Sequence, residues 1–294
     1  MDFDGFIGKG WDDHVKDAPG VAARLQSEGV ALLSSAEQIV PLAHLAHHVM
    51  GEHLGRWQEG LQFQERLAAL PLCEPGGTAA QALRRFMASL QLASGTTGMR
   101  DVRDALGTSD RIRVTAMAAA SLGEHDSARA QQLFQDALLQ TSTTALPATD
   151  PANRALAISG NDLAATLEEK PQRSAQERAL MILAAQTARH YWAIAGGWLE
   201  TERAEYRLAM TWLQAGDPAQ ARQHAQNCLV TVEANNAPAL ERFFGWEALG
   251  RVDRSAGNSS GHALALEQAE TAFAALDASD HGWCQASLDK LRAA

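Results

Sequence analysis

The sequence is poor in cysteine and tyrosine, and it has no long apolar run. Its three cysteines, Cys73, Cys228 and Cys284, are far apart and form no Cys-x-x-Cys pair, which excludes a disulfide framework and a zinc knuckle. No apolar stretch approaches the length of about 18 residues that a membrane span needs. With only two tyrosines and few β-branched residues, the composition is dominated by alanine and leucine and favours helix over sheet.

The charge balance is acidic. There are 25 Lys and Arg against 35 Asp and Glu, which gives a formal net charge of −10 and a pI near 5.4. A nucleic-acid-binding protein needs a basic surface for its phosphate contacts, so this class is excluded. The first residues, MDFDGFIGKGWDD, lack the apolar core of an export signal, and we therefore expect a cytoplasmic protein.

Helical periodicity runs through nearly every long segment, and no segment alternates with the period of two expected of a strand. Two capping boxes, Ser34–Glu37 and Ser174–Glu177, are typical helix starts, because their side chains satisfy free backbone amides. Asp150 and Asp217 each precede a proline that suits the first helical turn. Glycines suited to left-handed helix ends are Gly55, Gly95, Gly123, Gly216 and Gly257.

These signals divide the chain into helices joined by short turns. The predicted helices span 36–53, 57–70, 79–93, 109–122, 125–141, 151–168, 175–194, 198–215, 218–234, 239–256, 262–277 and 280–292. Pro41 predicts a kink or a later start in the first of them. A short helix is expected within 94–108, and 141–151 is a longer loop or a weak boundary.

Two stretches carry a repeat pattern. Residues 205–229, EYRLAMTWLQAGDPAQARQHAQNCL, place small residues on both sides of a glycine turn. Residues 246–258, WEALGRVDRSAGN, contain Trp-x-x-Leu-Gly and are followed by Ala269, Phe273 and Leu276. The pattern resembles the tetratricopeptide repeat (TPR), in which small residues let two helices approach closely, and the resemblance is clearest over 198–277.

The resemblance implies an all-α fold, a right-handed α-α solenoid of about five to six TPR-like hairpins over 34–278. Residues 1–33 would form an N-terminal capping segment and 279–294 a C-terminal capping helix. Glu205 and Asp253 depart from the pattern, which has Trp and Tyr at these places, and the glycine turns are not spaced by multiples of 34. The array is therefore degenerate, and an irregular all-helical domain remains the alternative.

Residues 44–53, HLAHHVMGEH, contain four histidines. On an α-helical wheel, His44, His47 and His48 lie opposite the buried stripe, whereas His53 points away with the apolar residues. The spacing of His44 and His48 would suit a metal, but neither a His-Glu-x-x-His motif nor a partner helix rich in carboxylates supplies further ligands. We predict no metal site here. The three histidines form a solvent-facing or hydrogen-bonded helix face or, if the resemblance holds, a patch for ligand contact.

The TPR resemblance also places a groove along the first helix of each hairpin. The further residues expected there are Asn161, Arg203, Tyr206, Met210, Glu247, Arg251 and Arg254. This mixture would suit an amphipathic helix or an extended peptide. Tyr206 and Met210 could equally pack between hairpins. The tryptophans of this half are expected in the core: Trp192, Trp198, Trp212 and Trp246.

No catalytic constellation is present. The glycine-rich GGT (76–78) and SGTTG (94–98) lack the strand and the Lys-Ser or Lys-Thr of a phosphate loop, and no Gly-x-Ser-x-Gly motif occurs. We therefore expect a non-enzymatic scaffold that binds a protein or peptide, with no catalytic residues, cofactor or metal. The alternative is a sensor for a small molecule or signalling peptide, similar to helical-repeat regions of some bacterial transcription regulators. The third hypothesis is a metal-dependent enzyme using His44 and His48.

Overall fold

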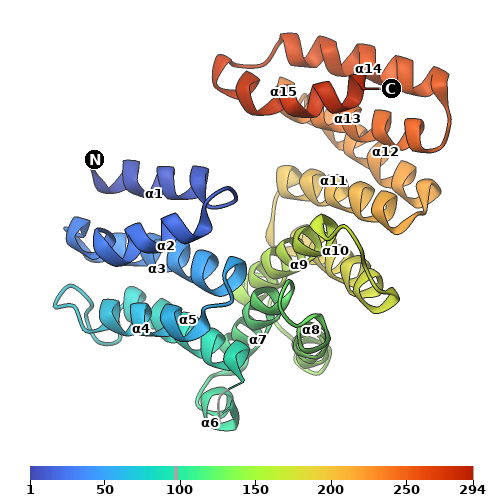
Figure 1. Cartoon of the computed structure of the whole chain (residues 1–294). Helices are drawn as coiled ribbons and strands as arrows, with labels where there is room; N and C mark the ends of the chain where they lie inside the picture. Colours follow the sequence, from blue (N-terminus) through green and yellow to red (C-terminus); the bar gives the residue numbers. More distant parts are fainter. Residues whose placement is uncertain (96–98, 294) are drawn as a thin grey trace. The chain divides into compact units, whose positions relative to one another are not determined.

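The described chain is all-helical, which confirms the all-α part of the predicted fold class (Figure 1). The computed structural model describes residues 1–95 and 99–293, with only the backbone of 99–101, and these residues contain no strand. Part of the predicted turn SGTTG, residues 96–98, lies outside the described residues. In the described chain, no helix combines the length and apolar character that crossing a membrane requires.

The chain divides into two compact units, Met1–Ala155 and Leu156–Ala294. The elements of the first are α1 (Phe3–Asp13), α2 (Ala18–Ser27), the 3₁₀ turns η1 (Gly29–Leu32) and η2 (Ala36–Gln38), α3 (Ile39–Ala46), the π-helix η3 (His47–His53), α4 (Trp57–Ala68), α5 (Thr78–Ser94), α6 (Met99–Asp104), α7 (Thr108–Leu122) and α8 (Ser127–Ser142). Helix α9 (Pro151–Glu169) crosses the division. The elements of the second are α10 (Ala175–Ala195), α11 (Trp198–Ala215), α12 (Pro218–Ala234), α13 (Ala239–Ser255), α14 (Ser259–Ala274) and α15 (Ala278–Arg292).

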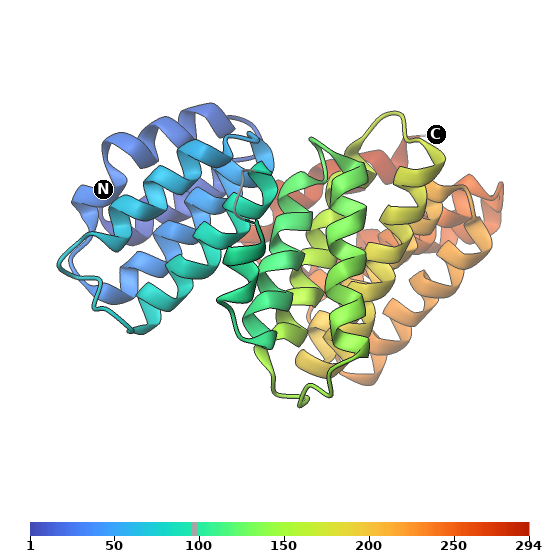
Figure 2. The same ribbon diagram turned by 90° about the horizontal axis from the view of Figure 1, so that it is seen from below.

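Helices that follow one another in the chain pack against one another. In the first unit α4 packs on α5, α5 on α7, and α7 on α8; the pair α7 and α8 is seen side by side in Figure 2. In the second unit the same order runs from α10 through α14. Neighbours in sequence are therefore neighbours in space, as short connections between helices favour.

Of the predicted capping residues, Ser174, Asp150 and Asp217 accept from backbone amides at the starts of α10, α9 and α12. The Ser174 amide donates to Glu177 Oε2 at 2.8 Å, and the Glu177 amide donates to Ser174 Oγ at 3.1 Å. The box predicted at Ser34–Glu37 is shifted by one residue, because Gln38 Oε1 accepts from the amides of both Ser34 and Ser35. A longer amide side chain at this position reaches back to the start of the turn as a Glu would.

Four of the five glycines that we predicted at helix ends have positive φ, whereas Gly123 has φ −52°. Its turn closes through right-handed backbone, with the Gly123 amide donating to the carbonyl of Ala120. The expectation for Pro41 is met by a later start. The α-helical part begins at Ile39, so the proline lies in the first turn, where no amide donor is needed.

The N-terminal 33 residues form two helices that belong to the core of the first unit. Asp2 and Asp17 cap them by accepting from the amides of Gly5 and Gly20, both at 2.9 Å. Their apolar faces are buried with the faces of α3, η3, α4 and α5; the buried residues that α1 and α2 contribute are Phe3, Phe6, Val21, Ala22 and Leu25. This arrangement brings the end of α1 to the predicted histidine stretch.

Small residues allow close helix contacts in the second unit. A Cβ atom at Gly160 would lie 2.7 Å from the Ala184 carbonyl oxygen, so α9 and α10 require glycine there. The small residues predicted along α11 and α12 are fully buried: Ala209, Ala221, Ala225 and Cys228. All three cysteines are free and buried.

Buried carboxylates lie where the repeat pattern calls for aromatic residues. Glu205 is 5% exposed and accepts from Arg189 Nε at 2.5 Å and from His224 Nδ1 at 2.7 Å. Burial favours its protonated form, but the hydrogen bonds from His224 and Arg189 hold the pKa of Glu205 below its usual value. Asp253, 1% exposed, pairs with Arg222 of α12. Charge pairs thus replace aromatic packing between these helices.

Candidate functional site

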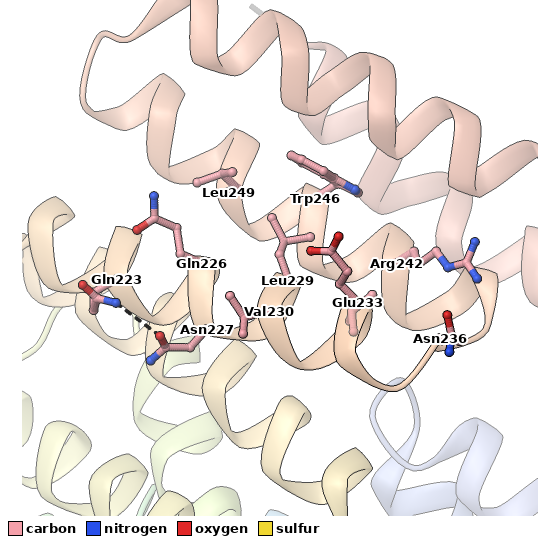
Figure 3. Close-up of a pocket in the computed structure, with 11 residues that line it drawn as sticks. Gln223, Gln226, Asn227, Leu229, Val230, Glu233, Asn236, Arg242, Trp246 and Leu249 are labelled. Carbon is pink, nitrogen blue, oxygen red and sulfur yellow. Dashed lines mark hydrogen bonds between the residues drawn. The ribbon is translucent and has the colours of Figure 1, made fainter.

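A groove of about 820 Å³ lies between helices α12 and α13 (Figure 3). The two helices are joined by a four-residue turn in which Asn236 has φ 46°. They approach closely because residue 245 is a glycine, where a Cβ atom would lie 2.9 Å from Leu229 Cδ2. Leu229 therefore reaches across the interface and forms part of the lining of the groove.

The buried stripe of α12 determines which side chains face the groove. Ala221, Ala225, Cys228 and Val232 are buried against neighbouring helices. The remaining face of α12 contributes Gln223, Gln226, Asn227, Val230 and Glu233 to the groove. Among these side chains, Val230 is aliphatic and 65% exposed.

Helix α13 supplies the opposite wall of the groove. Arg242, Trp246 and Leu249 recur at steps of four and three residues, so they form one stripe on α13 (Figure 3). Trp192, Trp212 and Trp246 are half-buried and Trp198 is 37% exposed, so none of the four tryptophans expected in the core is fully buried. Arg242 is held in place by a hydrogen bond from its Nε to the Ala237 carbonyl oxygen at 2.8 Å.

The polar side chains of the groove are mainly amides. Gln223, Gln226, Asn227 and Asn236 each carry a donor and an acceptor. Gln223 Nε2 donates to Asn227 Oδ1 at 3.2 Å, which aligns two of these amides along α12 (Figure 3). Asn227 also donates to the buried Glu205 at 3.2 Å, and this hydrogen bond fixes the orientation of the Asn227 side chain. The result is a row of amides beside apolar side chains.

The groove residues expected from the repeat pattern lie instead in contacts between helices. Tyr206 donates to Glu247 at 3.0 Å, and Arg251 donates to the same carboxylate at 3.3 Å. Glu247 is 1% exposed, and burial raises its pKa although Arg251 and Tyr206 oppose this shift. Met210 is buried in a core cluster with Ala248 and Leu249. The structure thus brings Tyr206, Glu247 and Arg251 together: the ion pair between Glu247 and Arg251 lies within α13, and the Tyr206 hydroxyl links it to α11.

The other expected groove residues are dispersed. Arg203 donates to Glu241 at 2.9 Å, and Asn161 accepts from Arg207 at 3.4 Å. Arg254 donates to the carbonyl oxygens of Lys290 and Ala293, both at 2.6 Å, at the end of α15. These contacts tie helices together, although the side chain of Arg203 remains 61% exposed.

The histidine stretch adopts a conformation that the helical wheel did not anticipate. Residues His47–His53 form a π-helix, in which the Leu54 amide donates to the Val49 carbonyl five residues earlier. The wider turn brings residues five apart onto one face. His53, which the α-helical wheel directs away, consequently lies with its Nε2 3.0 Å from His48 Nε2. The prediction that His53 cannot join the histidine cluster is wrong for this reason.

A third histidine completes a cluster that we call the histidine triad: His14, His48 and His53. One ring nitrogen of each lies within 4.8 Å of the others. His14 comes from the end of α1, and its ring centroid is 5.1 Å from that of each partner. Burial and repulsion from His48 and His14 lower the pKa of His53 to about 4, so its imidazole is neutral at pH 7.

His44 and His47 are not part of the triad. The ring of His44 lies between Trp11 and Phe86, with centroid distances of 5.3 and 6.1 Å. His47 is 2% exposed, packs on Phe86 at 5.0 Å, and has no hydrogen-bond partner for either nitrogen. Burial lowers its pKa to about 4. The three histidines predicted on one polar face therefore have different surroundings: His44 packs on aromatic rings, His47 is buried, and His48 belongs to the triad.

Sequence reasoning missed the groove and His14. The buried positions of α12 could be recognised from the sequence. The opposite, outward face of this helix carries Val230 together with the amides Gln226 and Asn227. His14 carried no local signal, because its partners lie more than thirty positions away in the chain. No protein-family model matches the sequence, and comparison with curated proteins found no similar one.

Proposed function

We propose that the protein is a non-enzymatic, TPR-like helical protein that binds an extended peptide segment in the groove between α12 and α13. One observation carries the proposal: a row of side-chain amides runs beside apolar residues, among them the exposed Val230 and the half-buried Leu229 and Trp246, in a groove of about 820 Å³. The proposal keeps the class of partner expected from the sequence. The proposed contact surface lies on α12 and α13, whereas the sequence led us to expect it on the first helix of each hairpin.

The chemistry of the lining suits a peptide backbone. An extended peptide has unpaired N–H and C=O groups along its length, and side-chain amides can both donate to and accept from them. Gln226 and Asn236 are exposed on this surface, and Gln223 and Asn227 form a pair beside them. Such contacts give affinity with little dependence on peptide sequence.

Apolar and charged side chains would supply selectivity. Leu229, Val230, Trp246 and Leu249 offer a surface for one or two apolar side chains of the peptide. Trp and Arg are the residue types that most often dominate binding energy, and both occur on the α13 wall. Glu233 and Arg242, one on each wall, favour a segment with charges of both signs.

A small-molecule sensor is the weaker alternative. Pockets for small molecules bury most of the ligand surface and are lined mainly by apolar groups. The α12 wall here consists largely of exposed polar side chains, including Gln223, Gln226 and Glu233. A surface of this kind covers one side of an elongated ligand, which favours a peptide.

The proposed repeat architecture rests on packing order in the second unit. Alternate helices α11 and α13 contact each other, as the first helices of successive hairpins do in a solenoid. At Gly250, a Cβ atom would lie 2.8 Å from Leu291 Cδ1 and 3.3 Å from Ala265 Cβ, so the Leu-Gly step of the repeat pattern lies in a crowded interface. These features support a degenerate TPR-like stack of hairpins.

A peptide-display experiment tests the proposal. A phage-displayed dodecapeptide library is selected on the immobilised full-length protein, and the enriched peptides are synthesised and measured by fluorescence anisotropy. Val230→Glu and Gln226→Ala change exposed side chains, so both variants should keep the fold. Each is expected to weaken binding by about tenfold or more, because it places a charge on the apolar strip or removes a backbone contact.

Two matched variants serve as controls. Leu139→Glu introduces the same charge at an aliphatic residue on α8 that is 63% exposed, and Gln285→Ala removes an exposed amide on α15. Both should bind like wild type. Selection of no peptide, or equal loss of affinity in the groove variants and the controls, would reject the groove as the binding surface.

A further inference from the structure

We propose that His14, His48 and His53 bind one late transition-metal ion of the zinc class and thereby fasten helix α1 to the π-helix η3. The three residues come from two separate segments of the first unit, and their ring nitrogens converge to within 4.8 Å. This site is distinct from the proposed peptide groove, which lies in the second unit. The two proposals therefore stand or fall separately.

The partners of the Nδ1 atoms favour metal binding through Nε2. His48 Nδ1 lies 2.6 Å from Glu52 Oε2, and His14 Nδ1 contacts the Trp11 carbonyl oxygen. Because a carboxylate and a carbonyl oxygen accept hydrogen bonds, Nδ1 is the donor in each ring, and Nε2 is the nitrogen of each ring that can ligate a metal. Metal-bound histidines nearly always donate their other ring N–H to a carboxylate or a carbonyl in this manner.

The spacing of the nitrogens also fits. His48 Nε2 and His53 Nε2 are 3.0 Å apart. Two imidazole nitrogens bound to tetrahedral zinc at about 2.0–2.1 Å would be separated by about 3.3 Å, so a small rotation of either ring suffices. Without a metal, His53 Nε2 can donate a hydrogen bond to His48 Nε2, whereas metal binding requires that His53 carries its hydrogen on Nδ1.

The π-helix explains how the chain achieves this spacing. In an α-helix His48 and His53 would point in different directions, whereas the wider turn places them on one face. Gly51 lies in the same turn, where a Cβ atom would be 2.9 Å from Leu90 Cδ2. A rare backbone form is thus accommodated where the imidazoles meet, as is frequent at functional sites.

The donor set selects the class of ion. Three neutral imidazoles suit Zn²⁺, Cu²⁺ and Ni²⁺, and they disfavour Mg²⁺ and Ca²⁺, which prefer oxygen ligands. Glu52 is engaged with His48 Nδ1 and so acts as an outer partner that orients the ring. The ring of Trp11 lies 5.1 Å from the ring of His48 and covers one side of the site.

Metal titration of the full-length, tag-free protein tests the assignment. After treatment with a chelator, Zn²⁺ binding is measured by calorimetry, the bound metal is counted by elemental analysis, and Co²⁺ reports the coordination by its visible absorption. We expect one ion per chain. His14→Gln and His53→Gln should each lose the stoichiometric site, and Glu52→Gln should bind about 10-fold or more weakly.

Two further variants make the outcome decisive. His190→Gln removes an exposed histidine of α10 in the second unit and should bind metal like wild type. His44→Gln should also retain the site; loss of binding in this variant alone would assign the metal to the pair His44 and His48 and overturn the triad. Circular dichroism of each metal-free variant verifies the fold. Absence of a stoichiometric site in folded wild-type protein would leave a hydrogen bond between His53 and His48 as the explanation of their contact.

Discussion

Tyr206 donates its hydroxyl proton to Glu247 Oε2 at 3.0 Å, and this bond joins helix α11 to helix α13. Arg251 approaches the other oxygen of the same carboxylate at 3.3 Å. Glu247 is 1% exposed, so its charge depends on these two donors for stabilisation. The cluster lies where the repeat pattern led us to expect ligand-binding side chains, and it serves instead as a contact between alternate helices.

Removal of the tyrosine hydroxyl should destabilise the protein. Tyr206→Phe keeps the ring, which packs edge-to-face on Phe244, but leaves the buried carboxylate with one donor fewer. We expect a loss of about 1–3 kcal/mol in the free energy of unfolding, measured by urea denaturation. Glu247→Gln should reduce the effect of Tyr206→Phe in a double-mutant cycle. Additive effects would show that the two side chains are not coupled.

Glu202 should make stability depend on pH. It is 2% exposed, and burial together with the nearby Glu241 raises its pKa to about 7. The unfolded chain therefore releases the proton near the ordinary pKa of 4.5, while the folded protein keeps it until about 7. The stabilisation is complete at acidic pH and is lost as the pH rises through this window. The total loss from this group is roughly 3 kcal/mol.

The variant Glu202→Gln should remove this dependence, because a neutral amide of the same shape takes the place of the carboxyl. Urea unfolding between pH 4.5 and 8 measures the slope. Compared with wild type, the variant should be more stable at pH 8 and show a flatter profile. Glu267→Gln, which removes a carboxylate from the surface of α14, controls for the change in net charge. A parallel slope in wild type and Glu202→Gln would contradict the prediction.

Two glycine-to-alanine variants should have opposite effects. Gly51→Ala adds a Cβ atom 2.9 Å from Leu90 Cδ2, a fully buried side chain, and should destabilise the protein by about 1–3 kcal/mol. Gly8→Ala lies within α1, where the added atom has no neighbour within 4 Å, and should stabilise it by about 0.5–1 kcal/mol. Thermal and urea unfolding measure both changes. Tolerance of alanine at position 51 would mean that the π-helix can relax away from α5.

Local signals predicted much of the helical structure. Periodicity and capping place α10 to α13 within one or two residues of their observed ends, because each signal acts within a few residues of the helix end. The helices of 1–33 were missed although Asp2 and Asp17 are good caps, because their apolar residues are too few to show a period. The extra residue in the η3 turn has no sequence signature of its own, so the wheel assigned His53 to the wrong face.

The candidate sites depended on contacts between distant parts of the chain. Glu205 was recognised as a departure from the repeat pattern, but nothing local indicated that Arg189 and His224 would pair with it in the interior. The same applies to Tyr206 and Glu247, whose surface role was inferred from the pattern alone. For His14, the packing of α1 onto α3 and η3 determines its neighbours.

The carboxylates of Glu205 and Asp253 have a consequence for protein engineering. Each requires a cationic partner on an adjoining helix, Arg189 for one and Arg222 for the other. If α11 or α13 were placed beside a helix without that arginine, its carboxylate would be an unmatched negative charge in an apolar interior. These helices can therefore be exchanged or duplicated in a redesigned chain only together with the arginine that pairs with each carboxylate.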